Sequence, residues 1–176
     1  MINRKNQKGF SLIELLIVVA IILIIAAIAI PNLLRARMAA NESSAAGSIR
    51  SINTANATFQ TTYGHSFAPS LTALGGAAPA AGTAAPCNAA NLIDQTLGTD
   101  PATKSGYVFT YVGGTADTGD VASAGNPACG SRLTYTITAS PLTVGSTGNR
   151  SFFTDQTGVI RAIQGAGANA TSAPLQ

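Results

Sequence analysis

The segment from Phe10 to Ile30 constrains this chain most, because only Ser11 and Glu14 interrupt an otherwise apolar run of 21 residues. As an α-helix it would be about 31 Å long, which matches the hydrocarbon core of a bilayer. We therefore predict a transmembrane helix over residues 10–30. Glu14 is unusual there, because an ionisable group in a spanning helix costs about 2.5 to 3.5 kcal/mol or more. We expect this carboxylate to have a partner.

The residues at the start of the run are more specific than its hydrophobicity. Lys8-Gly9-Phe10-Ser11-Leu12-Ile13-Glu14 resembles the N-terminal motif of type IV pilin and pseudopilin precursors, in which a short basic leader ends in Gly. The resemblance implies that a prepilin peptidase cleaves between Gly9 and Phe10 and methylates the amino group of Phe10. It also implies that Glu14 pairs with the terminal amine of a neighbouring subunit during assembly. Pro31, at the end of the apolar run, fits the same pattern.

An ordinary secretory signal peptide is the alternative interpretation of the N-terminus. Ala27-Ile28-Ala29 would then be its small-x-small cleavage site. Against this, the apolar run is longer than the roughly 7 to 15 residues of a signal-peptide core, and Glu14 would be out of place. We therefore interpret residues 1–9 as a basic leader that is removed.

The division of charge argues against nucleic acid as a partner. The chain has 10 Lys and Arg residues and 7 Asp and Glu residues, but Arg4, Lys5 and Lys8 lie in the predicted leader. The mature chain would be close to neutral, and no basic cluster interleaved with aromatic residues follows Pro31. Few charges, with many Ala, Gly, Ser and Thr residues, indicate a hydroxyl-rich surface that suits an exported protein.

The helical pattern continues past the apolar run. Pro31 lacks the N–H that would bond the carbonyl four residues earlier, so it predicts a kink. Apolar residues then recur at steps of three, four and seven, and Gly64 is the kind of residue that follows a helix end. The opposite, polar face includes Glu42 and Asn53. We predict one long helix over residues 10–63.

The remaining residues, 64–176, predict one globular domain. Residues 64–105 are rich in Gly, Ala and Pro and are expected to form a variable loop. Strand patterns follow at Tyr107–Val112, Leu133–Ala139, Arg150–Thr154 and Gly158–Ala162, and residues 165–176 are expected to be a loose tail. The predicted fold is therefore α+β and type IV pilin-like, with the long helix packed on an antiparallel sheet of about four strands.

Cys87 and Cys129 are the only cysteines. In an exported domain such a pair predicts a disulfide, which would contribute roughly 4 kcal/mol in the chain-entropy model because the closed loop is long. The alternative is two buried free thiols, which is favoured only if the domain faces the cytoplasm.

The polar residues do not predict catalysis, a metal or another cofactor. We interpret His65, the one histidine, as a surface residue. Asp117 and Asp120 could contribute to a Ca²⁺ site, as a loop does in some major pseudopilins, but no bidentate Glu is near and a solvated turn is the simpler interpretation. Asn169-Ala170-Thr171 matches the N-glycosylation pattern, which often arises by chance.

The resemblance implies a structural subunit of a type IV pilus-like filament, in which the helices form the core and the domains cover the surface. The expected partners are further copies of the chain, prepilin peptidase, an assembly ATPase and platform, and the bacterial inner membrane. There the precursor would cross once, with its C-terminal domain outside the cytoplasm. After assembly it would lie in an extracellular or periplasmic filament.

Two other functions remain open at this level. One is a pseudopilin of a type II secretion system, whose short filament pushes folded proteins through an outer-membrane channel. The other is a membrane-anchored binding domain that does not polymerise, in which Glu14 would have no partner.

Overall fold

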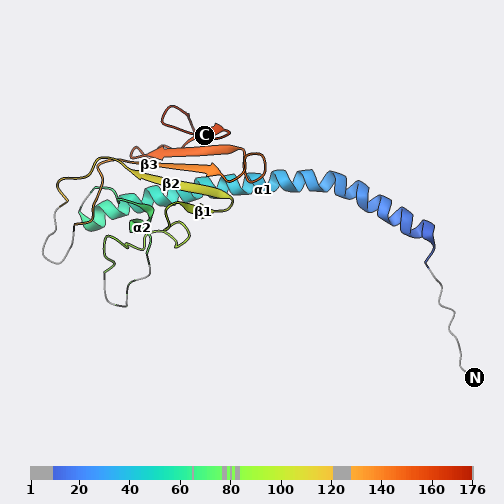
Figure 1. The fold of residues 1–176 in the computed structure, drawn as a ribbon, viewed down its shortest axis with the longest axis horizontal. Helices are drawn as coiled ribbons and strands as arrows, with labels where there is room; N and C mark the ends of the chain where they lie inside the picture. Colours follow the sequence, from blue (N-terminus) through green and yellow to red (C-terminus); the bar gives the residue numbers. More distant parts are fainter. Residues whose placement is uncertain are drawn as a thin grey trace, which may run out of the picture. The chain divides into compact units, whose positions relative to one another are not determined.

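The computed structural model describes residues 10–64, 66–76, 79, 81, 84–120 and 128–175. Their contacts divide the chain into two compact units, Met1–Arg37 and Met38–Gln176. The helix α1 (Leu12–Tyr63) belongs to both units, and the second unit also contains a small sheet and the short helix α2 (Leu71–Leu74) (Figure 1). The predicted α+β fold with one long N-terminal helix is confirmed.

The helix α1 is 52 residues long and is continuous through Pro31, so the kink at this residue stays a prediction. It ends before Gly64, whose φ of 70° is the left-handed conformation that commonly follows a helix. In the second unit, one face of α1 is buried. The buried residues recur at helical spacing: Glu42, Ala45, Ala46, Ser48, Ile49, Ile52, Ala55, Asn56 and Phe59.

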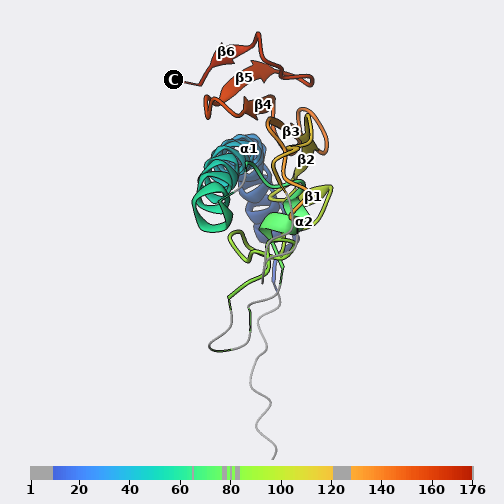
Figure 2. The same cartoon turned by 90° about the vertical axis from the view of Figure 1, so that its left-hand side faces the viewer.

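The sheet is an antiparallel meander in which every strand pairs with its neighbours in sequence (Figure 2). The described residues form six strands, not the predicted four or so. They are β1 (Ala102–Lys104), β2 (Tyr107–Gly113), β3 (Tyr135–Pro141), β4 (Arg150–Asp155), β5 (Arg161–Gln164) and β6 (Ala173–Pro174). The edge strands β1 and β6 were missed because segments of three and two residues are too short to show an alternating pattern.

A two-residue turn joins β1, which the sequence pattern did not predict, to β2. Lys104 pairs with Tyr107, and the intervening Ser105 and Gly106 have φ values of 50° and 73°. Two successive residues with positive φ are characteristic of the type I′ turn, whose twist matches that of the strands it joins. The Ser-Gly dipeptide was therefore the sequence signal for a hairpin between β1 and β2.

The core of the second unit lies between the sheet and the buried face of α1. On β2 and β3 alternate residues point inward, as the period of two predicts. Ala139 of β3 lies opposite both Phe109 of β2 and Phe152 of β4, so a small side chain makes room for two large ones. These three residues and Ile52 of α1 are 0% exposed. Sheet and helix thus bury one continuous apolar layer.

The C-terminal segment is more ordered than predicted. Residues 165–176 were expected to be a loose tail, but β6 pairs with β5, and the N–H of Leu175 donates to the carbonyl of Ile160 at 2.8 Å. Ala168 and Ser172 are buried. The small side chains of this segment hid its burial, because they carry little hydrophobic signal.

Candidate processing and assembly site

Phe10 precedes the helix and its side chain is 80% exposed. The other residue of the predicted cleavage site, Gly9, lies outside the described residues. The first intrahelical bonds of α1 run from the N–H groups of Glu14 and Leu15 to the carbonyl of Ser11, at 3.1 and 3.2 Å. Phe10 and Ser11 therefore precede the helix.

Glu14 folds back toward this junction. Its Oε2 accepts a hydrogen bond from the backbone N–H of Ser11 at 2.8 Å. This is one half of a capping box, in which an acidic residue at the third helical position caps the residue before the helix. A carboxylate in the first turn also interacts favourably with the helix dipole. The Ser-x-x-Glu spacing is the sequence signal for this cap.

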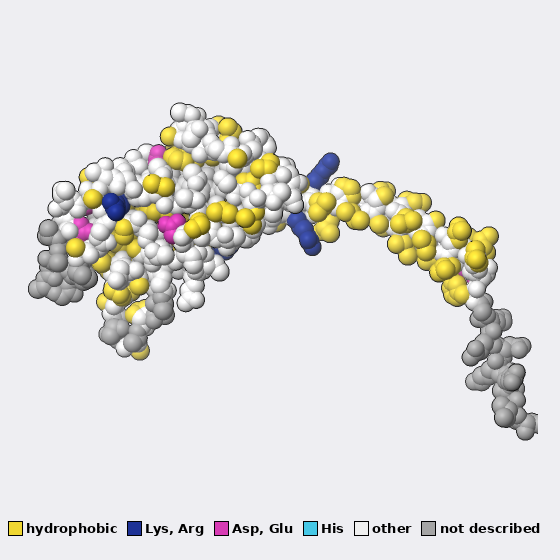
Figure 3. Space-filling model, viewed as in Figure 1, with side chains coloured by type: hydrophobic (Ala, Val, Ile, Leu, Met, Phe, Trp, Pro, Cys, Tyr) yellow, Lys and Arg dark blue, Asp and Glu magenta, His cyan; other side chains and the backbone are white. Residues whose placement is uncertain are grey.

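The apolar part of α1 has no protein cover within the described chain. Its large aliphatic side chains from Leu12 to Leu34 are between 46% and 79% exposed, and none of its most apolar window is buried (Figure 3). By length and composition, α1 is the one described helix that could cross a membrane. So long an apolar surface on a monomer indicates a membrane or a protein interface.

Cys87 and Cys129 form a disulfide, with an S–S distance of 2.09 Å and a Cα–Cα distance of 5.6 Å. Both cysteines are buried. The neighbouring segment is held by Asp120, whose carboxylate accepts from the N–H of Cys129 at 3.0 Å and from the N–H and hydroxyl of Ser131 at 2.6 Å. The disulfide attaches Cys87 to the segment that precedes β3, and the carboxylate joins the same segment to Asp120.

Asp117 and Asp120, the pair considered for calcium, use their oxygen atoms for hydrogen bonds within the protein. Asp117 accepts from the hydroxyl of Ser66 at 2.6 Å and from the N–H of Gly119 at 2.9 Å, and these bonds lower the pKa of its carboxyl. Within the described ranges, no group of three or more His, Cys, Asp and Glu side chains could hold a metal ion. His65 lies outside these ranges.

The residues of the N-glycosylation pattern, 169–171, are exposed, and the side chain of Asn169 forms hydrogen bonds within this segment. Oδ1 of Asn169 accepts from the N–H and the hydroxyl of Thr171, at 2.9 and 2.7 Å. These bonds form an Asx turn. They account for the positions of both residues without a modification.

Glu42 was placed on the polar face of the helix, and this prediction was wrong. Its side chain is buried, and its Oε1 accepts from the N–H groups of Asn149 and Arg150 at 2.8 and 3.2 Å, while Oε2 accepts from Nε of Arg150 at 2.7 Å. Burial raises the pKa of Glu42, but these donors and the positive charge of Arg150 outweigh burial and lower it. Glu42 thus joins α1 to the start of β4.

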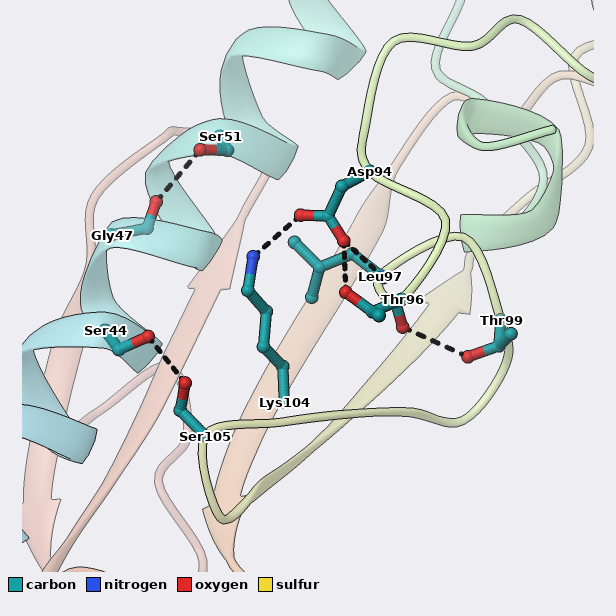
Figure 4. A network of polar contacts seen from close by, with 9 residues as sticks. All are labelled: Ser44, Gly47, Ser51, Asp94, Thr96, Leu97, Thr99, Lys104 and Ser105. Atoms are coloured by element: carbon teal, nitrogen blue, oxygen red, sulfur yellow. Dashed lines mark hydrogen bonds and ion pairs between the residues drawn. The ribbon is translucent and has the colours of Figure 1, made fainter. Parts of the chain in front are cut away.

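A second polar network holds the loop beside β1 (Figure 4). Asp94 pairs with Lys104 of β1 at 2.7 Å, accepts from the N–H of Leu97 at 3.0 Å and is also bonded by the hydroxyl of Thr96. Partial burial raises the pKa of Asp94, but Lys104 and Thr96 outweigh it and lower the value to about 2. The hydroxyl groups of Ser105 and of Ser44 in α1 form a hydrogen bond of 2.9 Å.

Comparisons with known proteins match only part of the chain. The family model for the prokaryotic N-terminal methylation motif matches residues 4–30. The chain is 68% identical over 38 residues to the type IV wide pilus major component PilA4 of Thermus thermophilus, covering 22% of this chain and 29% of that protein. It is 47% identical over 57 residues to the type IV major pilin protein PilA of Myxococcus xanthus, covering 32% of this chain and 26% of that protein.

The chain carries the N-terminal methylation motif and is similar over part of its length to type IV pilins. These alignments span less than a third of either relative, and no solved structure matches the chain significantly. The matched motif lies in the leader and the apolar part of α1. The sheet, the disulfide and the Glu42 contact are described from the structure of this chain.

Proposed function

We propose that this protein is a type IV pilin, a structural subunit of a type IV pilus-like filament. The observation that carries the proposal is the exposed apolar length of α1, directly preceded by a processing motif. An apolar helix that is uncovered in the monomer needs lipid before assembly and other helices after it. Both PilA4 and PilA are named as major pilus components, which favours this function over the secretion pseudopilin and the non-polymerising anchor.

Processing is the first proposed step. Prepilin peptidase would cleave between Gly9 and Phe10 and methylate the amine of Phe10. The position of Phe10, exposed and outside the helix, supports this step because a protease needs an extended substrate segment. Intact-mass and N-terminal analysis of the native protein should therefore find N-methylated Phe10. A mature terminus at Ile30 or beyond would contradict the proposal.

Pairing of Glu14 with the amine of a neighbouring subunit is the second proposed step. The carboxylate already reaches the N–H of Ser11, one residue from the amine that cleavage would create. Two charges at the same depth in a medium of low dielectric attract strongly, whereas one left alone is costly. Because only one axial stagger pairs every Glu14, this contact would also set the register between subunits.

The proposed cellular setting rests on the similarity to type IV pilins. The precursor would cross the bacterial inner membrane once, with residues 64–176 outside the cytoplasm, and an assembly ATPase and platform would extract it into the filament. The disulfide supports an exported domain, since such bonds persist mainly in oxidising compartments. The helices would then lie in the filament core and the sheet domains on its surface.

The decisive experiment separates the charge of Glu14 from its capping bond. Glu14→Gln keeps an oxygen that can accept from the N–H of Ser11 but removes the charge, whereas Glu14→Ala removes both. Each variant is expressed as the only copy, and the yield of sheared filaments is compared with total processed protein. We expect normal processing and few filaments from both variants. Normal filaments from Glu14→Gln would exclude charge pairing.

A further inference from the structure

Two arginines mark the end of the uncovered apolar length of α1. Arg35 and Arg37 directly follow Leu33 and Leu34, and both are exposed. The ion pairs of the described residues are Lys104–Asp94 and Arg150–Glu42, so within this part of the chain neither arginine has a carboxylate partner. Basic side chains project from opposite sides of the helix where the apolar segment ends (Figure 3).

The spacing between charges matches the thickness of a bilayer. The 20 residues between Glu14 and Arg35 contain no ionisable side chain. At the rise of an α-helix the two charged residues are about 31 Å apart along the axis, and the hydrocarbon core is about 30 Å thick. When Glu14 lies at one interface, Arg35 therefore lies at the other.

The chemistry at that second interface suits a guanidinium. Arginine binds phosphate through two parallel N–H groups, and its aliphatic stem can stay in an apolar layer while the charge reaches the surface. Residues two apart on a helix are about 200° apart around its axis. A protein on one side would thus reach only one of the two arginines, whereas lipid headgroups surround a single helix on all sides.

We propose that Arg35 and Arg37 bind the phosphate groups of phospholipids in the outer leaflet and so set the depth of α1 in the membrane. This rests on the membrane-held precursor of the proposed function. It adds that both phosphate contacts must be released when the subunit leaves the bilayer for a filament.

Depth can be measured with one reporter, because the chain contains no Trp. Leu33→Trp is introduced into the full precursor, which is reconstituted in phosphatidylethanolamine and phosphatidylglycerol bilayers with bromine at known acyl positions. We expect the double substitution Arg35→Gln and Arg37→Gln to move the tryptophan toward deeper bromines and to shift its emission to the blue. Conversion of both arginines to lysine should restore the original depth. Arg50→Gln, at another exposed arginine of α1, is the matched control and should have no effect.

Contact with phosphate is tested directly by phosphorus-to-carbon dipolar NMR on the same bilayers, with arginine labelled at the guanidinium carbon. The signal dephased by phosphorus should fall in the double glutamine variant by the share of these two side chains, with Arg4 of the leader as background, and should be unchanged in Arg50→Gln. The proposal would be overturned, with the membrane-held precursor left intact, by two results together. The tryptophan of the double glutamine variant would be quenched at the same depth as without these substitutions, and replacing the two arginines would leave the dephasing unchanged. Cross-links from Arg35 or Arg37 to a second subunit without dephasing would also overturn it. Absence of quenching by any brominated lipid would overturn the membrane-held precursor as well.

Discussion

The two glutamates of α1 are in opposite circumstances. Glu42 lies in the second unit, is 9% exposed, and accepts three hydrogen bonds from β4 and the residue before it. Glu14 lies in the first unit, is exposed, and accepts one hydrogen bond, from the N–H of Ser11. A carboxylate can accept about four hydrogen bonds. Glu42 is therefore satisfied within the monomer, whereas Glu14 retains capacity for another partner.

The two halves of α1 differ in the same way. Up to Leu34 the helix is apolar except at Glu14 and Asn32, and its large aliphatic side chains are exposed, whereas from Met38 onward one face is buried in the core. The first half can be satisfied only by lipid or by other helices, and the second half is satisfied by its own sheet. Substitutions in the first half should therefore change assembly, and those in the second half should change the stability of the domain.

The largest expected effect is a loss of filaments caused by a substitution in the first half of α1. We expect Glu14→Ala to abolish most filaments while the free energy of unfolding of the detergent-solubilised chain stays unchanged. Glu42→Ala should instead lower the free energy of unfolding and leave leader cleavage intact. Urea unfolding followed by circular dichroism, beside sheared-filament yield, tests the contrast. A fall in unfolding free energy for Glu14→Ala would show that the two halves are not independent.

The disulfide should give the largest effect on stability. Replacing both Cys87 and Cys129 by Ser removes a constraint on the unfolded chain, and we expect a loss of roughly 2 to 4 kcal/mol. Urea titrations of the oxidised wild type and the double variant give this difference. Nonreducing peptide mapping of the wild type should recover one linked pair, and recovery of two free thiols would count against both the bridge and an exported domain.

Glu42→Ala should destabilise the domain by about 2 to 3 kcal/mol, because two backbone N–H groups lose their acceptor and Arg150 loses its ion pair. Glu42→Gln is the matched variant. It keeps an oxygen for the N–H groups of Asn149 and Arg150, so the loss should be smaller. Equal losses from both substitutions would show that the charge, not the acceptor, matters.

A fall in pH should weaken the contact of Glu42 with Asn149 and Arg150. The folded state lowers the pKa of Glu42 below its ordinary value of 4.5. Ionised Glu42 therefore adds stability that is fully present above pH 4.5 and is lost as the pH falls toward its folded pKa. The difference in unfolding free energy between wild type and Glu42→Gln should shrink over this range. A difference independent of pH would argue against ionisation of Glu42 in the folded state.

The smallest effect is expected at the Asp94–Lys104 pair of the loop. Both side chains are substantially exposed, and exposed ion pairs typically contribute less than about 1 kcal/mol. Lys104→Gln should therefore lower the unfolding free energy by only a few tenths of a kcal/mol, and added salt should reduce the effect further. A larger loss in urea unfolding would indicate that β1 depends on this pair.

Local patterns in the sequence determined several parts of this protein. The apolar run, the Gly9-Phe10 junction and the Ser11-x-x-Glu14 spacing are contiguous, so the start of α1 and the N-terminal methylation motif are readable without a fold. The alternation in β2 and β3 is equally local, since period two requires only neighbouring residues.

Features that depend on distant segments could not be read from the sequence. Glu42 looks like any polar helix residue until residues 149 and 150, more than 100 positions away, supply its three donors. The burial of Ala168 and Ser172 and the pairing of β6 with β5 arise in the same way, because small side chains acquire neighbours only when the chain returns to the sheet edge. A sequence pattern reports the period of a residue's own element, whereas burial and satisfaction of a polar group depend on which other element packs against it.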